Sequence, residues 1–237
     1  MGRLISLVEQ NGEPARRVVA ATSSRGGEAH IVGVTGAPGS GKSTLVDGVA
    51  RVVREGGDRV AVIAVDPSSP STGGAVLGDR LRMHSHADDP GVFVRSMATR
   101  GSLGGLAPAT AAAARVLDAV GWPWVVIETV GVGQVEVDVS NLAHTTVVVV
   151  TPGWGDEVQT AKAGLMEVAD VFVVNKADRP GADQARRDLD GMLDLSPAGS
   201  GWRPSVVTTV ATTGEGLDDL WAVLLGHREF LAAGGDG

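Results

Sequence analysis

The clearest pattern along the chain is a series of short apolar runs separated by polar or amphipathic stretches. Runs rich in valine and isoleucine predict strands at residues 31–35, 60–65, 92–95, 124–128, 145–151, 171–174 and 205–210. Several of these runs are apolar almost throughout, which is typical of parallel strands that are covered on both faces.

Apolar residues with helical spacing predict helices between most of these strands. The predicted helices cover residues 43–55, 108–120, 156–169, 183–195 and 215–231, with a short one at 3–9. This alternation predicts an α/β fold with an open, mostly parallel sheet and helices on both faces. We expect a main domain at 28–232, a short helical extension and linker at 1–27, and a flexible tail at 233–237.

Charge and composition narrow the classes of function. The formal net charge is -8, which disfavours broad nucleic-acid binding. The chain has no cysteine, so disulfides, thiolate catalysis and cysteine metal sites are excluded. The first residues lack a signal-peptide pattern, and no apolar run approaches the roughly 20 residues that span a bilayer. We therefore expect a cytoplasmic protein.

A glycine-rich stretch follows the first predicted strand directly. Residues 36–44 read Gly-Ala-Pro-Gly-Ser-Gly-Lys-Ser-Thr and fit the phosphate-loop pattern G-x-x-x-x-G-K-[ST]. Glycines let backbone N–H groups surround a phosphate, and the following helix points its first amides at the same oxygens. The strand before the loop and the helix after it predict a P-loop NTPase fold. The candidate phosphate-binding residues are Gly36, Pro38, Gly39, Ser40, Gly41, Lys42, Ser43 and Thr44.

Acidic residues follow two other strands. Asp66 ends the second strand, where it either binds Mg²⁺ or starts a proline-rich turn through its own side chain. Glu128 opens Glu-Thr-Val-Gly at 128–131, where phosphate-hydrolysing switch proteins place an acid near Mg²⁺ and a glycine N–H near the γ-phosphate. The candidate metal ligands are Ser43, Asp66, Asp79 and Glu128, and the candidate catalytic residues are Lys42, Asp79, Glu128 and Gly131.

Two features bear on the rate of hydrolysis. Val132 follows Gly131, so no glutamine stands there to orient a water molecule, and we expect slow intrinsic turnover. The candidates for an internal charge stabiliser are Arg80, Arg82, Arg95 and Arg100, and the sequence does not choose among them.

A second motif points to the base of the nucleotide. Asn-Lys-Ala-Asp at 175–178 follows the sixth strand, and the Asp178 carboxylate can accept hydrogen bonds from N1–H and N2–H₂ of guanine. The stem of Lys176 can lie along the purine ring. Ala211, Thr212 and Thr213 form a loop that can offer a backbone N–H to guanine O6. The predicted ligands are therefore GTP and GDP, with Mg²⁺.

Longer strings in the chain resemble one family of GTPases, the MeaB/ArgK family, which includes the human methylmalonic aciduria type A protein. They are Val-Asp-Pro-Ser-Ser-Pro-Ser-Thr-Gly-Gly at 65–74, Leu-Gly-Asp-Arg at 77–80, Val-Arg-Ser-Met-Ala-Thr-Arg-Gly-Ser-Leu-Gly-Gly-Leu at 94–106 and Glu-Thr-Val-Gly-Val-Gly-Gln at 128–134. The resemblance covers nearly the whole chain.

The resemblance implies a Mg²⁺-dependent GTPase that is a chaperone and gatekeeper for an adenosylcobalamin-dependent acyl-CoA mutase of the methylmalonyl-CoA type. It also implies that residues 152–162 form a third loop, which reports the nucleotide state to the mutase. Val135, Trp154 and the stretch at 160–164 depart from the family pattern. Relatives continue into a dimerisation arm beyond the point where this sequence stops, so we expect a monomer or a weak dimer.

Two other functions share this core. A metallochaperone GTPase of the nickel-insertion type would need a Cys/His cluster, and the chain has no cysteine. A P-loop kinase for a small molecule would need an acceptor pocket, and the guanine motif argues against ATP.

Overall fold

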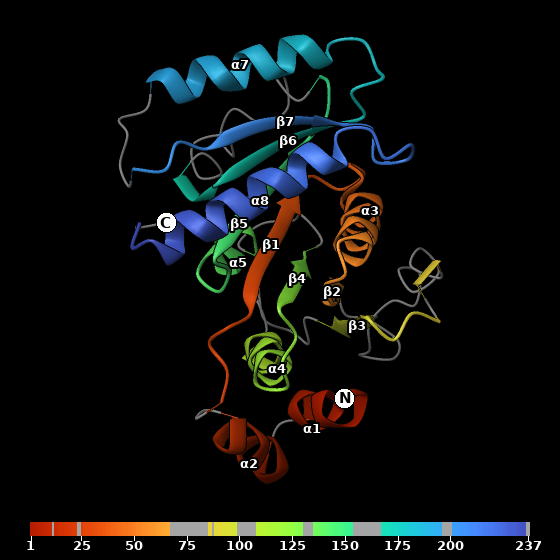
Figure 1. The fold of residues 1–237 in the computed structure, drawn as a ribbon, viewed down its shortest axis with the longest axis vertical. Helices are drawn as coiled ribbons and strands as arrows, with labels where there is room; N and C mark the ends of the chain where they lie inside the picture. Colours follow the sequence, from red (N-terminus) through yellow and green to blue (C-terminus); the bar gives the residue numbers. More distant parts are fainter. Residues whose placement is uncertain are drawn as a thin grey trace.

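The computed structural model describes residues 1–10, 12–22, 25–66, 85–86, 88–98, 108–129, 135–153, 167–195 and 201–235. Within them, seven strands form one parallel sheet in the order β3-β2-β4-β1-β5-β6-β7 (Figure 1). The strands are β1 (His30–Gly36), β2 (Val60–Asp66), β3 (Val92–Ala98), β4 (Trp124–Glu128), β5 (Thr145–Val150), β6 (Val171–Asn175) and β7 (Ser205–Thr209). All six strand pairings are parallel, so the predicted fold class and all seven predicted strands are confirmed.

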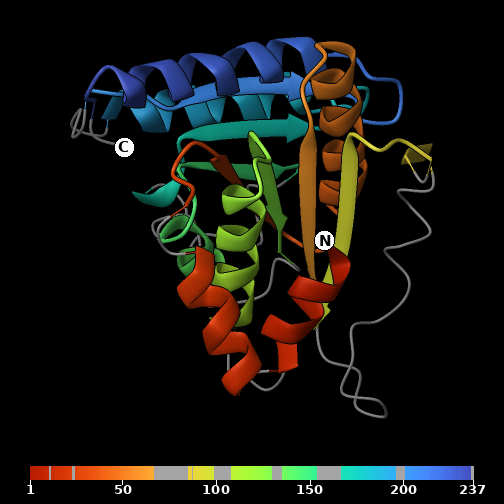
Figure 2. The ribbon, with the colours of Figure 1, turned by 60° about the horizontal axis from the view of Figure 1, so that its bottom comes forward.

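Helices cover both faces of the sheet. The helices α3 (Lys42–Glu55) and α8 (Leu217–Ala232) pack on one face, against alternate residues such as Val32, Val34 and Trp124. The intervening residues, such as Ile31 and Val125, face α4 (Pro108–Ala119) on the other side, since successive side chains of a strand point to opposite faces. Figure 2 shows α8 and α4 on opposite sides of the sheet. Over β5 and β6, α7 (Ala182–Leu195) extends the layer that begins with α4.

Two helices precede the first strand in the chain and lie at the bottom of Figure 1. They are α1 (Gly2–Gln10), close to the predicted helix at 3–9, and α2 (Glu13–Thr22), which the sequence did not predict. Helix α1 buries Ile5 and Val8 in the same cluster as α4. The stretch that leads into β1 is held by the carboxylate of Asp118 on α4, which accepts hydrogen bonds from the backbone N–H groups of residues 27–29.

The helices predicted at 43–55, 108–120, 183–195 and 215–231 are confirmed as α3, α4, α7 and α8. A short helix, α5 (Val135–Ser140), was missed. Most of the predicted helix at 156–169 lies outside the described residues. Among the residues that the structure describes, no helix is long and apolar enough to cross a membrane.

Candidate functional site

The glycine-rich stretch forms the turn between β1 and α3, at the carboxyl end of the central strand. Strands β2 and β3 lie to one side of β1 and β5 to β7 to the other, and ligands of open α/β sheets bind at such a switch point. Gly41 precedes the first residue of α3 with φ 92°, a left-handed conformation that favours glycine. A Cβ on Gly41 would also lie 2.4 Å from Nδ2 of Asn175. Glycine at 41 is therefore required by both the backbone and a close neighbour.

Two polar groups of this loop face its interior. The Lys42 ammonium is buried and donates to the carbonyl oxygens of Gly36 (2.7 Å) and Ala37 (3.0 Å). The hydroxyl of Ser40 is buried without a hydrogen-bond partner among the described groups. An unsatisfied buried hydroxyl costs free energy, so it marks a place where a ligand oxygen gains a contact.

Two oxygen groups meet beside the loop. The Ser43 hydroxyl on α3 donates to Oε1 of Glu128, at the end of β4, over 2.5 Å. Glu128 is 7% exposed. The backbone of Asp66 ends the neighbouring strand β2, and the side chain of Asp66 lies outside the described parts. A hydroxyl and a carboxylate oxygen are ligands that Mg²⁺ prefers, so the described residues fit that ion.

Asn175 connects three segments that are far apart in the sequence. Its Nδ2 donates to the carbonyl oxygen of Ser40 over 2.8 Å. Its Oδ1 accepts from the hydroxyl of Thr209 (3.1 Å) and from the backbone N–H of Ala211 (3.1 Å). Asn175 is 2% exposed, so these bonds are shielded from water. One amide thus fixes the phosphate loop, the predicted base motif and the loop at 211–213 relative to each other.

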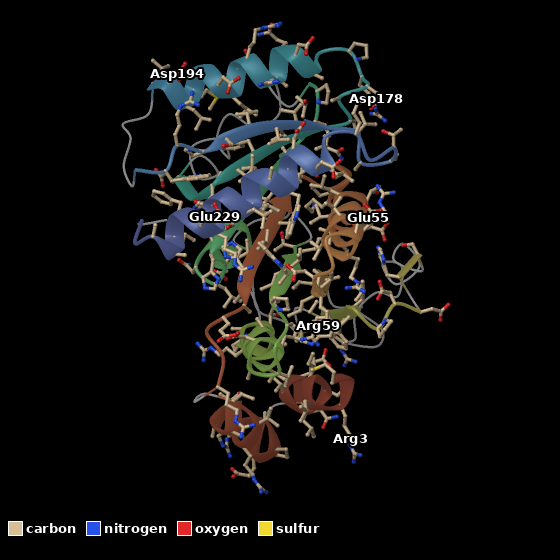
Figure 3. The ribbon with its side chains drawn as sticks, in the orientation of Figure 1. Arg3, Glu55, Arg59, Asp178, Asp194 and Glu229 are labelled. Carbon is tan, nitrogen blue, oxygen red and sulfur yellow. The ribbon has the colours of Figure 1, made fainter. Side chains whose placement is uncertain are left out.

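The other residues of the base motif lie at the surface. Lys176 donates to the carbonyl oxygen of Gly39 over 2.7 Å, and it has a φ of 59°, which is rare outside glycine. Asp178 is exposed and has no hydrogen bond or ion pair to another described residue. Figure 3 places Asp178 at the edge of the molecule, where β6 leads into α7. Thr212 and Thr213 are exposed, whereas Ala211 is half-buried.

Several other candidates lie outside the described residues, and one lies elsewhere in the fold. Asp79 and Gly131 lie outside the described residues, as do Arg80, Arg82 and Arg100. Arg95 on β3 donates instead to Ser6 (3.1 Å) and pairs with Glu9, both on α1. Arg95 therefore ties the amino-terminal helix to the edge strand. Sequence reasoning missed the bonds that Asn175 makes to Thr209 and to the backbone of Ser40. Thr209 lies in no motif, and the phosphate-loop pattern does not indicate a partner for the carbonyl oxygen of Ser40.

The fold and the phosphate loop define a P-loop NTPase, and comparison with known proteins places the chain among the GTPases. The family model "Methylmalonyl Co-A mutase-associated GTPase MeaB" matches residues 1–237. The chain belongs to this family.

Relatives extend over most of the chain. A Pyrococcus abyssi protein, whose name places it among the GTPases, is 56% identical over 236 residues, which are 98% of this chain and 73% of its own length. The GTPase ArgK of Escherichia coli is 38% identical over 86% of this chain and 63% of its own length. The mouse methylmalonic aciduria type A homolog, a mitochondrial protein, is 36% identical over 86% of this chain and 50% of its own length.

Solved structures share the fold. A protein described as an LAO/AO transport system kinase superimposes with a TM-score of 0.80 at 27% identity, over 98% of this chain and 71% of its own. HypB from Helicobacter pylori, solved with nickel, has a TM-score of 0.62 at 18% identity, over 90% and 93% of the two chains. The second likeness shows the fold alone. Together the relatives establish a GTP-hydrolysing enzyme that binds GTP and GDP.

Proposed function

We propose that this protein is a Mg²⁺-dependent, intrinsically slow GTPase that acts as a chaperone and gatekeeper for an adenosylcobalamin-dependent acyl-CoA mutase of the methylmalonyl-CoA type. The observation that carries the nucleotide part is the position of Asn175, whose amide holds the base motif against the phosphate loop. The family description, and the mouse relative named for methylmalonic aciduria, support the mutase part.

The phosphate loop supplies charge and hydrogen bonds. Lys42 now satisfies two loop carbonyl groups, at Gly36 and Ala37, and a bound triphosphate would draw this ammonium toward the β- and γ-phosphates. The unpartnered hydroxyl of Ser40 and the amides at the start of α3 would donate to the same anion. These groups are fixed before the reaction, which lowers the cost of stabilising charge that develops in the transition state.

Oxygen ligands for the metal would come from Ser43 and Glu128, with Asp66 and Asp79 as the other candidates. When bound, Mg²⁺ would neutralise phosphate charge and orient the terminal phosphate. Ser43 and Glu128 must first give up the hydrogen bond between them, which is 2.5 Å long.

Guanine would be selected at the rim of the site. The exposed Asp178 carboxylate is free to accept from guanine N1–H and N2–H₂, while the stem of Lys176, anchored at Gly39, would lie along the purine. The half-buried backbone of Ala211 would contribute the N–H for guanine O6. Adenine offers no donor pair to Asp178 and would leave the carboxylate unpaired.

Slow turnover follows from Val132, which stands after Gly131 where a glutamine would orient the attacking water. We therefore infer that a partner accelerates hydrolysis. The third loop at 152–162 is the proposed contact that carries the nucleotide state to the mutase.

The decisive experiment measures GTP hydrolysis and GTP affinity with and without a purified methylmalonyl-CoA mutase. We expect faster turnover with the mutase and a coupling of about 1–3 kcal/mol between mutase and nucleotide binding. The variant Lys42→Ala should lose turnover, whereas Arg186→Ala, an exposed change on α7 that loses only the Asp190 ion pair, is the matched control. A mutase without effect on either quantity would reject the chaperone role and leave the GTPase intact.

The same preparation tests the two other functions. Among the described residues, no group of three or more His, Asp or Glu side chains is placed to hold a metal ion. We therefore expect no bound nickel apart from any that occupies the proposed Mg²⁺ site. A kinase would transfer the γ-phosphate of labelled nucleotide to a small molecule or protein, whereas the proposed GTPase releases all of the label as inorganic phosphate.

A further inference from the structure

A buried polar cluster lies at the opposite end of the sheet from the nucleotide site. It joins His30 at the start of β1, Thr145 at the start of β5 and His227 on α8, all three at most 5% exposed. Nε2 of His30 lies 2.6 Å from the Thr145 hydroxyl, and that hydroxyl lies 2.8 Å from Nδ1 of His227. Nε2 of His227 then faces Oδ1 of Asp170 over 3.6 Å.

The hydrogens of this cluster have a defined direction. The Thr145 hydroxyl carries a single hydrogen, so it donates to one imidazole and accepts from the other. An ionised Asp170 only accepts, so it favours a hydrogen on the facing Nε2 of His227. Nδ1 of His227 must then accept from Thr145, and Thr145 must accept from Nε2–H of His30. With Asp170 ionised, each group therefore donates to the next one in the order His30, Thr145, His227, Asp170.

A proton on Asp170 would reverse this order. Its Oδ2 accepts the backbone N–H of Thr146 over 2.6 Å, which leaves Oδ1 to carry the proton. Oδ1–H would donate to Nε2 of His227, which otherwise has no hydrogen-bond partner within the described structure. His227 would then carry its hydrogen on Nδ1 and donate to Thr145, and Thr145 would donate to His30.

The surroundings favour the proton on the carboxyl group over either ring. Burial raises the pKa of Asp170 to about 6, against the opposing hydrogen bond from Thr146. Burial lowers the pKa of His227 to about 4, and burial together with His144, Arg228 and His227 lowers the pKa of His30 to about 3. Near pH 6 the first proton therefore goes to Asp170, while both rings stay neutral. The aromatic neighbours Trp202 and Phe230 add no charge.

We propose that His30, Thr145 and His227 form a hydrogen-bond relay that fastens α8 to the base of β1 and β5, and that protonation of Asp170 reverses its direction. The relay is a pH-sensitive device of the fold itself, separate from the nucleotide site and independent of the proposed function. In both states one hydrogen lies between Asp170 and His227, carried by Nε2 when Asp170 is ionised and by Oδ1 when it is protonated.

The test reads which ring nitrogen of each histidine carries hydrogen, by ¹H–¹⁵N correlation NMR on the GDP-bound full chain. Between pH 7.5 and 5.0 we expect His30 and His227 to change together from Nε2–H to Nδ1–H, with a midpoint near the titration of Asp170. His144 is an internal reference, because its Nδ1 accepts the N–H of Ile31 over 3.0 Å and its hydrogen must stay on Nε2.

Two variants make the outcome sharp. In Asp170→Asn the amide oxygen takes the N–H of Thr146 and the amide NH₂ faces His227, so both rings should show Nδ1–H at pH 7.5 as well as at 5.0. In Thr145→Val the relay is cut, so His30 should no longer follow His227. Rings that keep Nε2–H across this pH range in the wild type, or in a folded Asp170→Asn variant, would overturn the proposal.

Discussion

Nδ2 of Asn175 lies 2.8 Å from the carbonyl oxygen of Ser40, although the two residues are 135 positions apart in the chain. This bond joins the end of β6 to the turn after β1. The hydroxyl of Thr209 and the N–H of Ala211 fix the other end of the same amide, so the side chain cannot rotate without losing all three bonds. The base and phosphate halves of the site therefore form one rigid unit.

Replacement of this amide should weaken both stability and nucleotide binding. Asn175→Ala removes three buried hydrogen bonds, each worth about 0.5–1.5 kcal/mol net, and leaves the Ser40 carbonyl unpaired. We expect a lower melting temperature and at least a tenfold loss of GDP affinity in calorimetry. Thr209→Val, which removes only one of the partners, should give a smaller loss of both. Equal effects of the two variants would contradict the central role of Asn175.

The proposed base contact predicts a change of specificity. Asp178→Asn should weaken GTP by about 1–3 kcal/mol, because the pair of acceptors for guanine is lost. Binding of xanthosine nucleotides should improve, since their C2 carbonyl can accept from the new amide. Asp178 is exposed and has no hydrogen bond or ion pair to another described residue, so the unfolding temperature without nucleotide should not change. Wild-type protein that binds ATP and GTP equally in calorimetry would refute this assignment.

Two glycines of the phosphate loop should respond differently to alanine. Both have positive φ, 92° at Gly41 and 77° at Gly39, so each alanine carries backbone strain of about 1 kcal/mol. A Cβ at 41 would also lie 2.4 Å from Nδ2 of Asn175, whereas a Cβ at 39 meets nothing within 4 Å. We expect Gly41→Ala to lower the unfolding free energy of the nucleotide-free protein clearly more than Gly39→Ala. Similar losses in urea titrations would mean that Asn175 moves aside at little cost.

The sheet could be predicted because each strand carries its own signal in the sequence. A run such as 171–174 is apolar at every position and is buried on both faces, as the pattern indicated. Helix α2 was missed because it contributes little to the core, with only Ala15 buried. Helix α5 has six residues, too few to show a helical period.

Motif residues of the site could be named from sequence, but the bonds between them could not. The bond between Ser43 and Glu128 depends on α3 and β4 lying side by side, which spacing along the chain does not encode. The place of Arg95 was open for the same reason, since its partner Glu9 belongs to a helix far earlier in the chain.

The relay residues also predict how stability depends on pH. The folded pKa values of His30 (about 3) and His227 (about 4) lie below the unfolded value of 6.5, so their contribution to stability is present above pH 6.5 and is lost as the pH falls. The pKa of Asp170 is raised from 3.8 to about 6, so the folded state gains a proton first and stability rises as the pH falls from 6 toward 3.8. Asp170 therefore offsets one of the two histidines in this window.

Each proton by which the unfolded and folded states differ changes the unfolding free energy by about 1.4 kcal/mol per pH unit. Between pH 6 and 4.5, His227→Gln should make the acid-induced loss of stability shallower by about that slope, and Asp170→Asn should make it steeper by a similar amount. The measurement is urea unfolding at several pH values, compared as slopes so that a constant change of stability cancels. Arg186→Ala, an exposed change on α7 at a residue outside the relay, should keep the wild-type slope. Slopes that change in the same direction in His227→Gln and Asp170→Asn would contradict the opposite signs of the two titrations.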